Sequence, residues 1–124
     1  MINVVLPLQT VSEANVHQHW RQRQKRAKFQ RSMSALILNV PITAQKLDKS
    51  TEPLTVTLTR LSKSRGLDSD NLASSQKHVR DGIADALGID DRDPRVTWQY
   101  AQERAKEYGV RVEITKREGA SVSI

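Results

Sequence analysis

The alternation of apolar residues with threonine that begins the segment 54–61 constrains the fold more than any other stretch of the chain. The segment is Leu-Thr-Val-Thr-Leu-Thr-Arg-Leu, and both valine and threonine favour extended structure. Side chains on a strand point alternately to opposite faces, so one face of this strand should contact a core and the other should contact water. The sequence therefore predicts a β-sheet that is covered on one face.

A helical pattern follows in residues 70–87 and is predicted to form one amphipathic helix. Its apolar positions recur at intervals of three, four and seven and include Leu72, Val79, Ile83 and Leu87. The opposite side of the helix carries Asp70, Ser74, Lys77 and Asp81. Gly88 follows the last apolar position and is expected to end the helix in a left-handed conformation. This helix would have a buried side and a side open for chemistry.

The remaining elements complete an expected order of strand, helix, strand, helix, strand, strand. They are a strand over 2–7, a helix over 21–40 ended by Asn39 and Pro41, a polar loop over 43–52, and strands over 96–102 and 110–114 paired as an antiparallel hairpin. Trp20, at the start of the first helix, is expected to pack on the core rather than to stack on a base. The fold class expected is α/β (α+β), with about four strands in one mixed sheet and two main helices.

The composition limits the chain to a single compact domain. A length of 124 residues, 37% of them hydrophobic, is enough for one core and too short for two ordinary domains. We therefore expect one domain over 1–124, with a flexible tail over 116–124. The chain has no cysteine, which excludes disulfides and thiolate metal sites. Neither a signal peptide nor a membrane-spanning segment is recognisable, so a cytoplasmic protein without membrane contact is expected.

The net charge of +6 is concentrated in one part of the chain. No acidic residue occurs between Glu13 and Asp48, and the first helix begins there. Basic residues predicted to bind DNA are Arg21, Arg23, Lys25, Arg26, Lys28, Arg31 and Arg65. Such a surface attracts a polyanion, and nucleic acid is the commonest cytoplasmic one. The alternative is a solvated basic helix face that has no partner.

Two acidic clusters lie at the ends of the segment 70–87 and are candidates for a cation site. Asp68 and Asp70 precede it, and Asp90, Asp91 and Asp93 follow it. In extended geometry, side chains two residues apart point the same way, so Asp68 and Asp70 would share one ion. Hard oxygen ligands without cysteine favour magnesium or manganese over zinc. The alternative is that these residues cap a helix and form a turn.

The two clusters must approach each other for a site to exist. At about 1.5 Å per residue, a straight helix would hold residues 70 and 90 roughly 30 Å apart. Three arrangements would solve this: the turn after Gly88 folds back, the helix is shorter than its pattern, or the second cluster comes from a second subunit.

Several motifs in this order resemble the RusA-like Holliday junction resolvases, a family of endodeoxyribonucleases common in phages and prophages. The central motif is Asp-x-Asp-Asn-Leu at 68–72, followed by a lysine, an apolar helix and an Asp-Asp turn before a strand. A strand ending in Leu6-Pro7, Ser12 and Asn15 as Ser-x-x-Asn, the aromatic Trp20 and a basic helix precede it in the same order. The resemblance covers most of residues 2–115.

The resemblance implies a homodimer that uses magnesium to cut symmetric strands of a four-way DNA junction in recombination and repair. Asp68 and Asp70 would be metal ligands, with Asp91 or else Asp90 as the third. The family's catalytic lysine falls at Ser74 here, and Lys77, one helical turn later, is the candidate replacement. The catalytic set is thus Asp68, Asp70, Asp91 and Lys77.

Two other functional classes are compatible with the same residues. One is a DNA-binding protein of phage origin without catalysis, in which the acidic site has decayed. The other is a small phage interaction or structural protein, for which DNA affinity would be limited to weak, salt-sensitive attraction.

Overall fold

The alternating segment forms strand β2, Leu54–Ser62, in the computed structural model, which describes residues 1–12 and 19–117. Leu54, Val56 and Leu58 are fully buried, whereas Thr55 and Thr57 between them are partly exposed. The strand therefore has one core face and one wetter face, as the alternation predicted.

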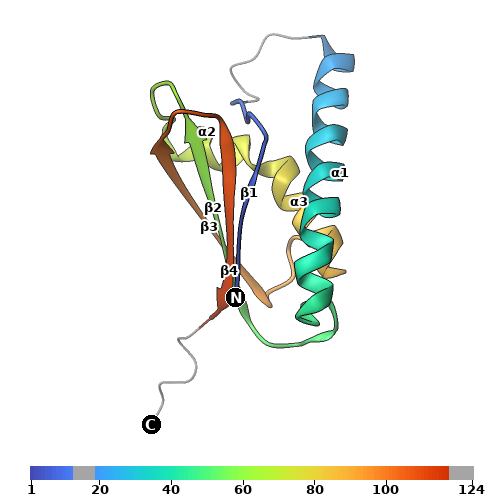
Figure 1. Cartoon of the computed structure of the whole chain (residues 1–124). Helices are drawn as coiled ribbons and strands as arrows, with labels where there is room; N and C mark the ends of the chain where they lie inside the picture. Colours follow the sequence, from blue (N-terminus) through green and yellow to red (C-terminus); the bar gives the residue numbers. More distant parts are fainter. Residues whose placement is uncertain (13–18, 118–124) are drawn as a thin grey trace.

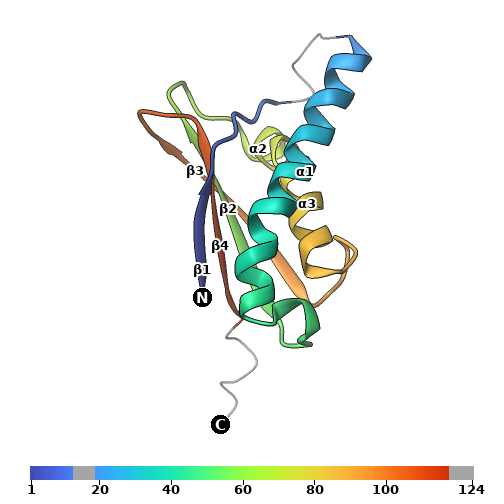
Figure 2. The same cartoon turned by 45° about the vertical axis from the view of Figure 1, so that its right-hand side comes forward.

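Strand β2 lies in a four-stranded mixed sheet of order β1-β4-β2-β3. The other strands are β1 (Ile2–Leu6), β3 (Val96–Arg104) and β4 (Gly109–Lys116). Strand β3 pairs with β2 in parallel, and β4 is antiparallel to both β1 and β2. Figures 1 and 2 show the helices gathered over one face of this sheet. The expected fold class, a single-domain α/β arrangement with a mixed sheet, is confirmed.

The expected hairpin between the last two strands is wrong. Strand β4 does not pair with β3 but inserts between β1 and β2. Val110, Val112 and Ile114 of β4 are fully buried, so the centre of the sheet removes them from water. The end of β3 is polar and exposed, which suits the edge of the sheet.

The first helix, α1 (Trp20–Ala44), is longer than predicted and contains Pro41. Its buried positions are four residues apart: Gln30, Ser34, Leu38 and Ile42. Proline removes one backbone hydrogen bond from the helix, yet the next residue, Ile42, is fully buried and anchors the last turn in the core. Burial of this turn outweighs the local helix-breaking tendency that favoured an end at Pro41.

The first half of α1 makes little contact with the core. No residue from Trp20 to Phe29 is buried, and Figure 1 shows these first turns standing apart from the sheet. The expectation that Trp20 packs on the core is wrong, because 56% of its surface is exposed. Trp20 lies beside His19, whose side chain accepts a hydrogen bond from Arg21 N and caps the helix.

The second predicted helix is divided into α2 (Ser69–Ser75) and α3 (Lys77–Leu87) by Gln76. Ser74 Oγ and Ser75 Oγ donate to the carbonyls of Asn71 and Leu72, at 3.1 and 2.7 Å. Such side-chain bonds compete with the helical ladder. The Gln76 side chain is fully buried and donates to Thr10 Oγ1 at 3.2 Å, which fixes the break in place.

Helix α3 packs closely against α1 at Gly82. A Cβ atom at Gly82 would lie 2.3 Å from the carbonyl oxygen of Arg31 and 2.8 Å from Ser34 Cβ. Glycine is therefore required for this helix–helix distance. The helix ends at Gly88, which has the predicted left-handed conformation with φ of 73°.

Some expected features fall in other places. The segment predicted as a loop contains a short 3₁₀ helix, η2 (Leu47–Lys49), with Leu47 buried. Lys116 belongs to β4, while residues 118–124 of the expected tail, and Asn15 of the Ser-x-x-Asn motif, lie outside the described residues. Within 1–12 and 19–117, none of the helices combines the length and hydropathy that crossing a bilayer requires.

Candidate functional site

The break at Gln76 brings residues from both acidic clusters to one pocket. This α2–α3 pocket has a volume of about 500 Å³. It is lined by Asp70, Ala73, Ser74, Lys77, Arg80, Asp91, Arg92 and Tyr100. Three of the four predicted catalytic residues, namely Asp70, Lys77 and Asp91, are thus placed around one space.

Two local features explain how Asp70 and Asp91, 21 positions apart, come to line one pocket. Asp70 lies in the first turn of α2 and Lys77 is the first residue of α3, on the same side of the chain despite the break. After α3, Gly88 N donates to Asp85 O and Ile89 N donates to Ala84 O, which turns the chain sharply. The break at Gln76 and the folded-back turn after Gly88 therefore operate together within one chain, although the helical segment ends where its pattern predicted.

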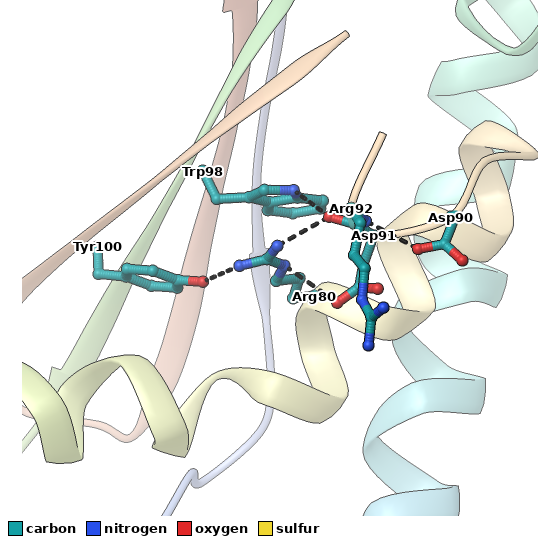
Figure 3. A network of polar contacts seen from close by, with 6 residues as sticks. All are labelled: Arg80, Asp90, Asp91, Arg92, Trp98 and Tyr100. Carbon is teal, nitrogen blue, oxygen red and sulfur yellow. Dashed lines mark hydrogen bonds and ion pairs between the residues drawn. The ribbon is translucent and has the colours of Figure 1, made fainter. Parts of the chain in front are cut away.

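Arg80 of α3 holds the acidic turn against β3 (Figure 3). Its Nη2 donates to the backbone carbonyl of Asp91 at 2.8 Å, and its Nε lies 3.5 Å from Asp91 Oδ2. Its Nη1 donates to the hydroxyl of Tyr100 at 2.8 Å, and the guanidinium carbon lies 4.8 Å from the centre of the Trp98 ring. Trp98 Nε1 donates to the same Asp91 carbonyl at 3.2 Å.

These three residues fix the position of Asp91, and sequence reasoning did not single them out. Arg80 lies three residues after Lys77. Trp98 and Tyr100 are two positions apart in β3 and therefore lie on the same face of the strand. Those spacings are visible in the sequence, but nothing there indicates that the helix and the strand face each other at this point.

Asp68 has a structural role at the start of α2. Its side chain accepts hydrogen bonds from the backbone N and from Nδ2 of Asn71, at 2.9 and 3.1 Å. Residues 68–70 are not an extended run, since Asp68 is the N-cap and Ser69 begins the helix. The strand-like geometry expected for Asp68 and Asp70 is therefore wrong.

Two of the motifs behind the family resemblance meet at Asn71. Ser12 Oγ donates to Asn71 Oδ1 at 2.8 Å, although the two residues are 59 positions apart. The same Asn71 binds Asp68 through its amide nitrogen. The loop after β1 is thereby attached to the start of α2.

Asp90 lies beside a different hollow. Its side chain accepts a hydrogen bond from Arg92 N at 2.9 Å, and this bond lowers the pKa of the Asp90 carboxyl. The hollow, of about 260 Å³, is also lined by Asp81, Asp85 and Asp91. Asp91 lines both this hollow and the α2–α3 pocket, so the two adjoin.

The four predicted metal ligands are divided between these places. Asp70 and Asp91 line the α2–α3 pocket, Asp68 caps α2, and Asp90 binds its own turn. Among the residues that the structure describes, no three carboxylate or imidazole side chains are grouped as ligands of one metal ion.

The basic part of α1 adjoins the α2–α3 pocket. Arg23, Gln24 and Ala27 of α1 line a hollow of about 340 Å³ together with Ser74, Lys77 and His78. Ser74 and Lys77 line both spaces. Arg21, Arg23, Lys25 and Lys28 are exposed and Arg26 is half-buried. Of these basic residues, Arg23 lines the hollow that adjoins the pocket holding Asp70 and Asp91.

Two of the predicted DNA-binding residues lie elsewhere. Arg31 forms a two-pronged ion pair with Asp85 of α3, with Nε–Oδ2 and Nη2–Oδ1 distances of 2.7 and 2.9 Å. This hydrogen bonding lowers the pKa of Asp85 and raises that of Arg31. Arg65 is exposed in the loop between β2 and α2, beside a pocket that contains Arg60.

A scan against protein-family models finds no match to this chain, and a search of curated proteins finds no significant match.

Proposed function

We propose that the protein is a magnesium-dependent, structure-selective endodeoxyribonuclease that resolves Holliday junctions by hydrolysing phosphodiester bonds in DNA recombination and repair. One observation carries the proposal: Asp70, Lys77 and Asp91 line one pocket, and the basic part of α1 adjoins it. Carboxylates, an ammonium group and a positive approach surface are the groups that metal-assisted cleavage of a phosphate backbone requires.

The residues present are compatible with magnesium. This ion is commonly held by one or two carboxylates and takes its other oxygens from water and substrate phosphates. Asp70 and Asp91 provide two carboxylates in one pocket. A bound magnesium ion would activate a water molecule for attack and offset negative charge on the phosphate oxygens.

The chain's own residues supply the remaining functions. Lys77, exposed at the first position of α3, donates to a phosphate oxygen and stabilises charge that develops in the transition state. Arg80 keeps the Asp91 turn in position through the contacts with Trp98 and Tyr100. Arg21, Arg23, Lys25 and Lys28 bind backbone phosphates without reading base sequence.

A second copy of the chain belongs to the proposal, because a four-way junction offers two equivalent strands. An exposed apolar stripe on α1 supports it: Phe29, Leu36 and Val40 are 55, 73 and 70% exposed. They lie at intervals of seven and four, away from the buried stripe that begins at Gln30.

Sedimentation equilibrium should give a dimer for the wild type and a monomer for Leu36→Glu, with Thr51→Glu as an exposed control outside α1. A monomeric wild type would refute this part.

One observation favours the rival function, a DNA-binding protein without catalysis. The carboxylates of Asp68 and Asp91 already have protein partners, Asn71 and Arg80. Such a protein would hold the junction equally well with or without magnesium and leave it uncut.

Cleavage of a labelled synthetic four-way junction separates the two functions. The proposal predicts paired symmetric nicks in magnesium, none in EDTA, and little cleavage of the matching linear duplex. Tight, magnesium-independent binding of the junction with no nicks would refute the nuclease proposal and establish the rival.

A further inference from the structure

Arg60 occupies a position in β2 where the alternation would place an apolar core residue. It continues the series Leu54, Val56 and Leu58 on the face of β2 that the helices cover, and it is only 7% exposed. An ionised side chain buried to this extent normally has a carboxylate partner. Within residues 1–12 and 19–117, no acidic side chain forms an ion pair with Arg60.

The guanidinium of Arg60 has unused hydrogen-bond donors. Its Nη2 donates to the backbone carbonyl of Thr10 at 3.3 Å. Its Nε and Nη1 are buried and have no hydrogen-bond partner among the described residues. Burial lowers the pKa of this guanidinium, which reflects the cost of holding the charge there without a counter-charge.

Arg60 lines a pocket that is rich in donors of the same kind. The pocket, of about 180 Å³, is also lined by Ser62, Ser64, Arg65, Gln102 and Arg104. This volume gives room for one phosphate group with some of its hydration. The carboxylate at its rim, Glu103, is already paired with Arg111 at 2.6 Å, and this contact lowers the pKa of Glu103.

The loop that forms one wall of the pocket is fixed in place. Gln102 accepts a hydrogen bond from Leu67 N at 2.8 Å and donates to Leu67 O at 2.7 Å. Gly66 permits this approach, because a Cβ atom there would lie 2.9 Å from Gln102 Oε1. Ser64 N and the Ser64 hydroxyl both contact Ser62 Oγ, at 3.1 and 2.9 Å. The pocket is thus a built feature of the ends of β2 and β3.

We infer that this pocket binds one phosphate group, with Arg60 as the buried donor, Arg65 and Arg104 as the outer charges, and one hydroxyl of the hydrogen-bonded pair Ser62 and Ser64 as a further donor. Arginine and hydroxyl groups are suited to phosphate oxygens, and a phosphate would supply the counter-charge that Arg60 lacks. The loop from Ser62 leads directly to Asp68 and α2. If the proposed function holds, the phosphate is one of the DNA backbone next to the cleavage site. The source of the phosphate thus rests on the proposed function, whereas the binding of phosphate by this pocket does not.

Titration with inorganic phosphate at constant ionic strength, followed by ¹⁵N NMR, tests the inference without DNA or magnesium. Saturable shifts of the Arg60 Nε–H signal and of the backbone amides of residues 62–66 are expected. Arg60→Gln should weaken phosphate binding about tenfold or more, as expected for loss of a charged hydrogen bond. Arg104→Gln, at an exposed residue whose loss does not endanger folding, should weaken it several-fold, and the charge-matched Lys49→Gln should leave it unchanged. No saturable shift, or equal effects of Arg104→Gln and Lys49→Gln, would overturn the inference.

Junction binding in EDTA then identifies the source of the phosphate. If it is a DNA phosphate, Arg104→Gln should reduce the slope of log K against log salt by about one, while Lys49→Gln should leave it unchanged. If the titration succeeds and this slope does not change, the pocket takes a free phosphate or a phosphate monoester. Failure of junction cleavage would refute the nuclease proposal alone, since the phosphate titration does not depend on it.

Discussion

Arg80 Nε lies 3.5 Å from Asp91 Oδ2, and the same guanidinium donates to the Asp91 carbonyl at 2.8 Å. One side chain of α3 thus holds both the backbone and the carboxylate of the acidic turn. Asp70 and Asp91 are the two carboxylates proposed to bind magnesium, and they lie far apart in the sequence. The geometry of the site therefore depends on the contact that holds Asp91 in place.

Arg80→Gln should therefore loosen the turn. We expect a loss of about 1–3 kcal/mol in the free energy of unfolding, from charged hydrogen bonds to a carbonyl and a hydroxyl. The magnesium concentration for half-maximal cleavage should rise at least about tenfold, as is typical for partners that orient a metal ligand. Tyr100→Phe, which removes one of the partners, should have a smaller effect on both. A lower magnesium requirement in Arg80→Gln would mean that Arg80 competes with the metal for Asp91.

Gly82→Ala should destabilise the protein, although alanine is the better helix former. The added Cβ would lie 2.3 Å from the Arg31 carbonyl, so α1 and α3 would have to separate. Overpacking of this kind costs about 1–3 kcal/mol, measurable by urea denaturation. Gly88→Asn is the matched control, because nothing lies within 4 Å of a Cβ there and asparagine tolerates its left-handed conformation. A Gly82→Ala protein as stable as the wild type would contradict the packing described.

The Arg31–Asp85 ion pair gives a pH-dependent contribution to stability. The pKa of Asp85 is lowered in the folded state, from an ordinary value of 3.8, by its hydrogen bonds to Arg31. The contribution is therefore present above the unfolded value and is lost as the pH falls through the lowered one. Both side chains are about half exposed, so Asp85→Asn should cost no more than about 1 kcal/mol at neutral pH. A thermal-unfolding series should show the wild type and the variant converging in acid; a difference that persists there would implicate another effect.

How much of this could be read from the sequence depends on the range of each interaction. The alternation in 54–61 and the left-handed Gly88 are local patterns, and both were predicted correctly. The position of β4 was not predicted correctly. Its pairing with β2 instead of β3 is decided by the burial of three apolar β4 residues at the centre of the sheet, which no local pattern indicates. The break at Gln76 was missed because it depends on a contact with Thr10, 66 positions away.

The same division holds for the candidate site. Helical periodicity alone placed Asp70, Ser74 and Lys77 on one side, and all three line the α2–α3 pocket. The approach of Asp91 depended on the break and on Arg80, which no local pattern indicates. Arg60 did leave a signal, since an arginine continues the apolar positions of an alternating strand.

Lys77 and Ser74 provide a test of the catalytic lysine. Lys77→Ala should lower the rate of junction cleavage by about 10²-fold or more, the usual effect of removing one group that stabilises transition-state charge. Because Ser74 lines the same pocket, adding Ser74→Lys to this variant should restore part of the rate. Junction affinity in EDTA, measured by fluorescence anisotropy, should change only slightly in either protein. If Lys77→Ala loses affinity and rate together, Lys77 binds the DNA backbone and does not act in the chemical step.

The central claim is that Asp70 and Asp91 form a catalytic pair, and single-turnover cleavage of a four-way junction in magnesium tests it most directly. Asp70→Asn and Asp91→Asn should each slow cleavage by about 10²-fold or more while leaving junction affinity in EDTA unchanged. Glu113→Gln is the control, because it removes a carboxylate from the face of β4 opposite the helices, between the buried Val112 and Ile114. Loss of cleavage in both aspartate variants with full activity in Glu113→Gln is the result predicted. Cleavage at the wild-type rate by either aspartate variant, or the same loss in all three, would contradict the account.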